Sequence, residues 1–232
     1  WNYIRGFNTF GTQWLDGLPL PGDPASYAVP RIPGYALERV EVVKGPASVL
    51  YGKAIPGGLV NQVTKRPQAV AQREVRLSAT HFGGAELATD LTGPLEEDGK
   101  FLYRLIALRR DAHTQVDLER DRQTMIAPSI TWRPSADTSL TVQAHYQKDD
   151  PRMSPRFYPV VGSHVPSPLF GYIPRSLYLG EPSTDSFNRS YKSLGYGFEH
   201  RFNDTVSVRQ NLRYGHAAQD MFLVRVHPFS AY

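Results

Sequence analysis

Strict alternation of polar and apolar residues dominates the sequence from position 71 onward. It is clearest over residues 140–147, 193–202 and 206–214, where only Gln210 interrupts the apolar side. A period of two is typical of β-strands that have one wet and one apolar face. Similar stretches occur at residues 73–82, 86–95, 100–111, 122–133 and 221–226. The sequence therefore predicts about eight consecutive strands of roughly ten residues each.

Strands of this length cross a bilayer when they are tilted, and the lengths of the connections between them also favour a membrane barrel. Short turns at residues 97–100, 134–137 and 203–204 alternate with longer connectors, the longest running from about residue 149 to 188. Aromatic residues stand at predicted strand ends, as a membrane-interface girdle requires: Phe82, Trp132, Tyr146, Phe202 and Tyr214. A soluble β-sandwich would also alternate, but these aromatics and the polar faces favour an outer-membrane barrel.

Composition argues against several other classes of protein. Aromatics make up 12 % of the residues although the mean hydropathy is −0.40, which suits rings at an amphipathic boundary. No apolar stretch reaches the ~18 residues of a transmembrane helix. The net charge of +4 is spread over interspersed basic and acidic residues, so we expect no nucleic-acid partner. Without cysteine, disulfides and thiolate metal sites are excluded.

The first 68 residues differ from the rest, being irregular and rich in glycine and proline. LERVEVVKG (37–45) is typical of a short strand and LVNQVTKR (59–66) of a second one. ASVLYG (47–52) between them predicts one or two turns of helix that end at Gly52. The chain opens on Trp1 without a signal peptide, so we expect the start of the mature protein to lie upstream.

Three parts of the sequence resemble a known family. LERVEVVKGPASVLYGKAIPGGLVNQVTKRP (37–67) resembles the plug signature of TonB-dependent receptors. YIRGF (3–7) and LDGLPL (15–20) resemble the stretch that precedes it in siderophore receptors. GEPSTDSFNRSYKSLGYGFEHRFNDTVSVRQNLRY (180–214) is similar to a barrel hairpin of the ferrichrome and ferripyoverdine receptor group. Lys44 departs slightly, since the family more often has arginine before Gly-Pro.

The resemblance implies a mainly β fold, a fragment of a transmembrane antiparallel β-barrel of about 22 strands with part of an N-terminal α+β plug domain. Residues 1–70 would be the C-terminal half of the plug, and residues 71–232 the first roughly eight barrel strands. It also implies a bacterial outer-membrane location, contact with outer-membrane lipid, and energy from the TonB–ExbB–ExbD complex, whose contact segment is absent here. Open strand edges are not tolerated in hydrocarbon, so we expect this fragment not to transport alone.

The function implied by the resemblance is uptake of ferric siderophores, especially of hydroxamate type. Such a chelator already coordinates its iron, so the receptor needs an aromatic pocket with a few polar groups, without metal ligands or a cofactor. By resemblance, the ligand-binding residues are Arg5, Leu20, Pro21, Gly22 and Tyr35 in the plug and Phe157, Tyr158 and Tyr172 in a barrel loop. Arg5 and the aromatic contacts have plainer alternatives. Arg5 could form a salt bridge to the barrel wall, Tyr35 could be a core ring beside Leu37, and the loop aromatics could cover their own loop.

Four charged residues, Glu38, Arg39, Glu41 and Lys44, resemble the plug charges that pair with barrel carboxylates and lock the plug in place. A solvated strand edge is the alternative for them. GPASVLYG (45–52) could present helix N–H groups to an anion. It lacks the Lys-Ser/Thr ending of a phosphate loop, so we interpret it as plug scaffold.

Other functions remain open from the sequence. The cargo could instead be haem, cobalamin or a glycan, and the gene could be a non-functional remnant. An outer-membrane enzyme would need a nucleophile set, but Ser139 and His145 share one predicted strand without a third member, so we expect no enzyme. The seven histidines lack metal-site spacing, so no metal site is expected.

Overall fold

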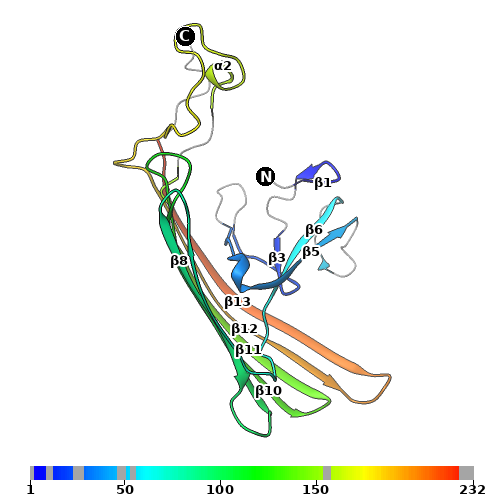
Figure 1. Cartoon of the computed structure of the whole chain (residues 1–232). Helices are drawn as coiled ribbons and strands as arrows, with labels where there is room; N and C mark the ends of the chain where they lie inside the picture. The colour runs from blue at the N-terminus through cyan, green and yellow to red at the C-terminus, as the bar shows by residue number, and fades with distance from the viewer. Residues whose placement is uncertain are drawn as a thin grey trace.

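The computed structural model describes residues 3–8, 13–22, 29–45, 51–52, 56–153 and 158–224. These residues form two parts (Figure 1). A large curved antiparallel sheet comes from the second part of the chain, and the described residues between 3 and 66, called the plug part below, lie on its concave side. The fold is mainly β, as the alternation predicts.

The large sheet has seven strands in the described residues, and each pairs antiparallel with its neighbour in sequence. They are β7 (Gln72–Ala79), β8 (Gly84–Pro94), β9 (Phe101–His113), β10 (Arg120–Ser135), β11 (Thr138–Asp149), β12 (Ser186–Arg201) and β13 (Ser207–Phe222). The separate strand expected at residues 221–226 does not begin at Met221, because the ladder between β12 and β13 runs unbroken to the Ser186–Phe222 pair. Tyr214 consequently lies in mid-strand and is not a strand-end aromatic.

The two faces of the large sheet carry different residues, as alternation requires. On the concave face, the polar residues His145 and Gln147 are buried. On the convex face, large apolar side chains remain exposed, among them Val75, Leu77, Ile126, Ile130, Trp132, Val142, Leu194 and Leu212. An apolar outer face is what a barrel wall presents to lipid.

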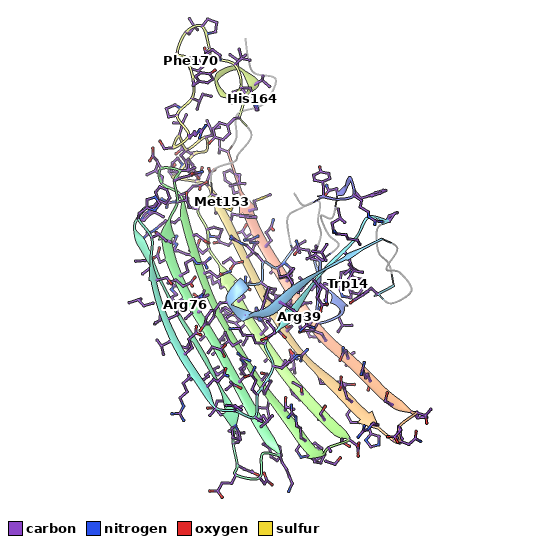
Figure 2. All side chains as sticks on the ribbon, turned by 45° about the vertical axis from the view of Figure 1, so that its right-hand side comes forward. Trp14, Arg39, Arg76, Met153, His164 and Phe170 are labelled. Carbon is purple, nitrogen blue, oxygen red and sulfur yellow. The ribbon has the colours of Figure 1, made fainter. Side chains whose placement is uncertain are left out.

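The connections differ between the two ends of the large sheet. They span residues 95–100, 136–137 and 202–206 at one end and residues 80–83, 114–119 and 150–185 at the other. The longest includes α2 (Val160–Ser163) and stands beyond the sheet, where Figure 2 labels His164 and Phe170. Long loops of outer-membrane barrels face the cell exterior, so this is the outer end. No helix in the described part of the chain is both long and apolar enough to span a membrane.

The plug part is built from short elements. These are β1 (Tyr3–Ile4), β2 (Phe7–Asn8), β3 (Gln13–Leu15), β4 (Leu18–Pro19), the 3₁₀ turn η2 (Gly34–Ala36), β5 (Leu37–Lys44) and β6 (Gly58–Thr64). β1 and β2 form a hairpin, and the other strands form a sheet in the order β4–β3–β6–β5. The two strands predicted here are confirmed as β5 and β6, whereas most of the helix predicted at 47–52 lies outside the described residues.

Two hairpins of the plug part turn through residues with positive φ. Arg5 and Gly6 (φ 52° and 80°) connect β1 to β2, and Asp16 and Gly17 (φ 52° and 77°) connect β3 to β4. Positive φ at both positions of a two-residue turn gives the twist that a hairpin needs, and the Asp-Gly pair suits it. Arginine does not favour this conformation, so the backbone at Arg5 is strained.

The hydrophobic core lies between the plug part and the concave face of the sheet. It joins Leu15, Ile32, Tyr35 and Ala36 of the plug part to Ala88, Ile106, Leu108, Met125 and Tyr191 of the sheet. A smaller cluster of Trp14 and Leu59 lies within the plug part. The main core is shared, so each part completes the burial of the other.

Candidate functional site

Arg5 occupies the tip of the β1–β2 hairpin, and it is exposed. Among the described residues it has no ion-pair partner, so the salt bridge considered as its alternative role is not present there. The absence of a side chain at Gly45 leaves space beside it, since a Cβ added there would lie 3.7 Å from Nη1 of Arg5. An exposed guanidinium on a strained turn can donate to an oxygen acceptor from outside.

Leu20, Pro21 and Gly22, called the apical turn below, directly follow β4. The Leu20 N–H donates to the Gln13 carbonyl (3.0 Å), and the half-buried Leu20 side chain packs against the core. Pro21 lies beside β13, because a Cβ added to Gly215 would be 3.4 Å from its Cγ. Gly22 is exposed. The apical turn therefore lies at the boundary between plug part and sheet.

Tyr35 lies inside the interface between the two parts and is only 8 % exposed. Its hydroxyl donates to Oε1 of Glu74 on β7 (3.0 Å). Lys65 Nζ and the Arg76 guanidinium carbon lie 4.5 and 4.3 Å from its ring centre. Burial and the bond to Glu74 raise the pKa of Tyr35 to about 12. The structure thus places Tyr35 in the core cluster, against which Leu37 also packs, and its hydroxyl is already bonded.

Two of the predicted loop aromatics share one hollow at the outer end. Tyr158 and Tyr172 line a space of about 530 Å³ together with Gln115, Val116, Ser163, Ile173, Pro174 and Arg175. Tyr172 is 62 % exposed, whereas Tyr158 is half-buried and donates to the Leu177 carbonyl (3.3 Å). Phe157 lies outside the described residues. The hollow combines aromatic walls with the guanidinium of Arg175.

The base of this loop is fastened to the loop between β9 and β10. The Asp117 N–H donates to the Ser176 carbonyl (2.7 Å), and Arg120 and Arg152 exchange two backbone hydrogen bonds (3.0 and 2.8 Å). Tyr178 in the same loop is buried and donates to Oδ2 of Asp185 (2.9 Å). Burial and this bond raise the pKa of Tyr178. The hollow is therefore held by defined contacts at its base.

The structure gathers the predicted ligand residues into separate groups. Tyr158 and Tyr172 belong to the loop beyond the sheet, while Arg5 and the apical turn belong to the plug part on the concave side (Figures 1 and 2). Tyr35 joins neither group because it faces the sheet. Within the described residues, no three histidine, aspartate or glutamate side chains are grouped as metal ligands.

The residues predicted to lock the plug, Glu38, Arg39, Glu41 and Lys44, all lie on β5, the edge strand of the plug sheet. Asn61 Nδ2 and Arg39 Nε each donate to Glu41 at 2.8 Å, and these bonds hold the pKa of Glu41 below its usual value. Both contacts stay within the plug part. In the described residues none of the four forms a hydrogen bond or ion pair with the large sheet, so their locking role is without support there.

A different charged cluster joins the plug part to the sheet. Lys65, just after β6, places Nζ 2.8 Å from Oδ2 of Asp90 on β8. Arg104 on β9 binds both oxygens of the same carboxylate at 2.7 Å, and Asp90 and Arg104 are both buried. Sequence reasoning missed this cluster, although Asp90 and Arg104 lie within the strands predicted at residues 86–95 and 100–111.

Side chains of the large sheet also bind the main chain of the plug part. Three long donors, one each from β9, β11 and β13, reach plug carbonyls. The bonds are Arg104 to Arg66 O (2.8 Å), Gln147 to Arg31 O (2.8 Å), and Arg213 to Leu15 O (2.8 Å), Leu18 O (3.0 Å) and Pro19 O (2.8 Å). Main-chain acceptors are invisible in a sequence pattern, so no motif identified these contacts.

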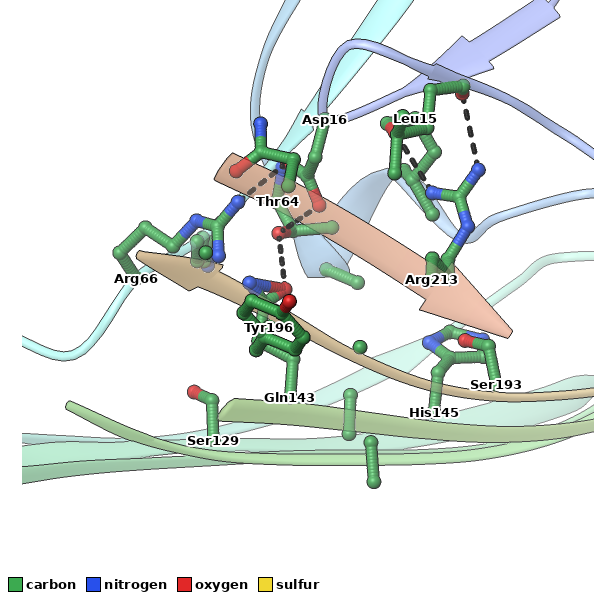
Figure 3. A pocket seen from close by; sticks show the side chains of 18 of the residues that line it. Leu15, Asp16, Thr64, Arg66, Ser129, Gln143, His145, Ser193, Tyr196 and Arg213 are labelled. Atoms are coloured by element: carbon green, nitrogen blue, oxygen red, sulfur yellow. Dashed lines mark hydrogen bonds and ion pairs between the residues drawn. The ribbon is translucent and has the colours of Figure 1, made fainter. Parts of the chain in front are cut away.

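A small gap of about 70 Å³ remains between the plug part and the sheet (Figure 3). On the plug side, Asp16 accepts hydrogen bonds from the backbone N–H and the hydroxyl of Thr64 (2.9 and 2.8 Å). On the sheet side, Gln143 lies 3.4 Å from the Thr64 hydroxyl. The walls of the gap mix these polar groups with apolar side chains such as Leu15 and Ile106, and its size gives room for a few water molecules.

Comparison with known proteins places the chain among relatives of similar sequence. Residues 2–59 match the family of the TonB-dependent Receptor Plug Domain. The chain is 38 % identical over 214 residues to the ferrichrome outer membrane transporter/phage receptor of Escherichia coli K12, covering 91 % of this chain and 28 % of that protein. It is 37 % identical to the ferrioxamine receptor of Yersinia enterocolitica, covering 92 % of this chain and 30 % of that protein. The chain thus spans less than a third of the length of these relatives.

Solved structures share the arrangement of a plug region against barrel strands. The pyoverdine outer membrane receptor FpvA of Pseudomonas aeruginosa PAO1 matches 99 % of this chain with a TM-score of 0.86, at 24 % identity and over 33 % of its own length. The open form of the ferric-catecholate import receptor Fiu of E. coli K12 also gives 0.86, at 19 % identity and over 35 % of its length. These likenesses show the fold. The chain belongs to the TonB-dependent siderophore receptors of the bacterial outer membrane, a family of transporters rather than enzymes, and contains a plug region with part of the β-barrel.

Proposed function

We propose that this chain serves, within a complete receptor, in the uptake of ferric siderophores of the hydroxamate class. The observation that carries the proposal is the 36–38 % identity, over about nine-tenths of the chain, to relatives named for ferrichrome and ferrioxamine. Both of those ligands are hydroxamates. The structures of pyoverdine and catecholate receptors match at lower identity and support the architecture without favouring a ligand.

The proposed ligand contacts come from the two outer groups. Arg5 would donate to siderophore oxygens from the tip of its hairpin, because it is exposed and has no ion-pair partner in the described residues. The apical turn would add apolar contact, and Tyr158 and Tyr172 would stack on the chelate from their hollow. Phe157 remains in the proposed set by its resemblance alone. Tyr35 is proposed instead to connect the plug part to β7.

The proposed partners follow from the family. Uptake across the outer membrane would draw energy from the TonB–ExbB–ExbD complex, and lipid would surround the convex face with its exposed Ile130 and Leu194. No resident cofactor is proposed, since iron would arrive inside the siderophore. Receptor segments other than the described barrel strands would have to supply the ion-pair partners of the predicted locking residues Glu38, Arg39, Glu41 and Lys44.

Uptake and binding would test the proposal directly. The protein is expressed from its complete reading frame in cells that lack other siderophore receptors, and uptake of radioactive iron is measured with ferrichrome and ferrioxamine B. Haem, cobalamin and a ferric catecholate serve as comparison cargoes. We expect the two hydroxamates to be taken up only when TonB is present, and their ferric forms to bind more tightly than the iron-free forms.

Two results would contradict the proposal. A preference for haem, cobalamin or the ferric catecholate would keep the architecture and replace the cargo. A reading frame that stops near residue 232, with no uptake of any ferric chelate, would indicate a non-functional remnant.

A further inference from the structure

Arg213 projects from the concave face of β13 into the β3–β4 hairpin (Figure 3). Its Nη1 donates to the Leu15 carbonyl, and its Nη2 donates to the carbonyls of Leu18 and Pro19. Leu15 and Leu18 are the pair that closes the Asp16–Gly17 turn. One guanidinium therefore binds both strands of the hairpin at the point where they meet.

These hydrogen bonds are stronger than those between neutral groups. Each is charge-assisted, and among the described residues no carboxylate lies within ion-pair distance of Arg213. The opposite side of the hairpin is held within the plug part, where the Asp16 N–H donates to the Gln62 carbonyl (2.8 Å) and the Gly17 N–H donates to Oδ1 of Asn61 (3.0 Å). The hairpin is thus fixed between β6 and β13, and Arg213 supplies the contact to the barrel wall.

The same stretch of β13 also contacts the apical turn. The carbonyl of Pro19 that Arg213 binds belongs to the peptide bond that leads into Leu20. Gly215 faces the same side of β13, and a Cβ there would come within 3.4 Å of Pro21 Cγ and 3.3 Å of the Tyr191 ring. Glycine leaves room for this close approach. β13 therefore fixes the start of the apical turn through Arg213 and its middle through Gly215.

We propose that Arg213 is a positioning residue for ligand binding, and that it sets the place of the apical turn relative to the barrel wall. Gly215 assists it by letting Pro21 approach β13. The proposal rests on the proposed function, because it assigns the apical turn to the ligand pocket. The cluster of Lys65, Asp90 and Arg104 holds the plug part to β8 and β9 and has no contact of this kind with the turn.

A spin label directly before the apical turn tests the positioning without any ligand. These 232 residues contain no cysteine, so Pro19→Cys, at an exposed position outside the proposed ligand contacts, provides the one attachment site within them in the protein expressed from its complete reading frame. We expect an immobilised nitroxide spectrum in the parent and a mobile one in Arg213→Gln, with partial recovery in Arg213→Lys. Arg209→Gln removes an exposed cation from the same strand and should leave the spectrum unchanged.

Binding of ferrichrome and ferrioxamine B supplies the second readout. Loss of one or two charge-assisted bonds should weaken both Kd values by roughly 10- to 100-fold in Arg213→Gln, and not in Arg209→Gln. Gly215→Ala keeps the three Arg213 bonds but crowds Tyr191 and Pro21, so it should weaken binding slightly while the label stays immobilised.

The two readouts separate the two proposals. An immobilised label in Arg213→Gln, with unchanged affinity, overturns the positioning role. If Arg213→Gln mobilises the label but the parent protein binds neither siderophore, the proposed function is overturned. The structural part of the inference then still holds.

Discussion

Two residues of the plug part adopt the same backbone conformation, which suits one residue type and not the other. Asp16 and Arg5 adopt the same φ of 52° in equivalent turns. Aspartate suits this conformation, and the Asp16 carboxylate accepts two hydrogen bonds from Thr64 within the plug part. Arginine does not suit it, and it forms no ion pair in the described residues. Strain at an exposed residue without an internal use is the pattern of a residue kept for binding.

Replacement of Arg5 by Asn should therefore separate stability from binding. Asparagine adopts positive φ readily, so the variant should be as stable as the parent or more stable by about 0.5–1 kcal/mol. Affinity for ferrichrome should fall by roughly 10-fold or more, because a charge-assisted donor is lost. Denaturant unfolding and a binding titration would measure the two effects. Unchanged affinity would remove Arg5 from the proposed site.

Tyr35 gives a prediction about pH at the same scale. Its pKa is raised to about 12 in the folded protein, against an ordinary value of 10.0. The stabilisation from its bond to Glu74 is then complete below pH 10 and is lost as the pH rises from about 10 to about 12. The difference in unfolding free energy between the parent and Tyr35→Phe should shrink over this interval. A constant difference across it would show that Tyr35 titrates normally.

At the scale of elements, two strands and a linker meet in one charged cluster. Asp90 of β8 balances two cations, Arg104 of β9 and Lys65 after β6, and the Asp90 and Arg104 side chains are 7 % and 5 % exposed. A buried carboxylate between two cations is tolerated because every oxygen is hydrogen-bonded. This arrangement makes the position after β6 a fixed junction between the plug part and the sheet.

Asp90→Asn should therefore be strongly destabilising. It leaves buried Arg104 without its counter-charge, which typically costs about 3–5 kcal/mol. Asp98→Asn is the matched control, because its ion pair with Lys100 lies in an exposed turn, and its loss should change stability far less. Denaturation of the complete protein in detergent would give both values. Equal effects would show that the cluster is not a junction.

At the scale of the whole molecule, the curved sheet separates two environments. Its convex face carries exposed apolar side chains, and its concave face carries buried polar side chains beside the core residues that pack against the plug part. Each strand must serve both environments at once, which is why the period of two is so strict. The shared core and the side chains that bind plug carbonyls then make the two parts one structure.

A cation on the convex face tests this separation. Ile130 lies in the middle of β10 and is 49 % exposed, so Ile130→Lys should destabilise the membrane-inserted protein by about 2–4 kcal/mol. Val208 lies near the start of β13, and Val208→Lys should cost no more than about 1 kcal/mol because it is close to the interface. Urea titration in phospholipid vesicles would compare them. Similar losses at both positions would contradict a lipid-facing convex surface.

The strands, their two faces and the plug strands at 37–45 and 59–66 follow from the sequence by itself, because alternation and turn residues are local properties. The end of β13 did not follow, since it depends on pairing with β12. The placement of Tyr35 against Glu74, the Lys65–Asp90–Arg104 cluster and the Arg213 bonds to plug carbonyls required the tertiary structure. These contacts join residues distant in sequence, and many of their acceptors are main-chain atoms that every residue possesses.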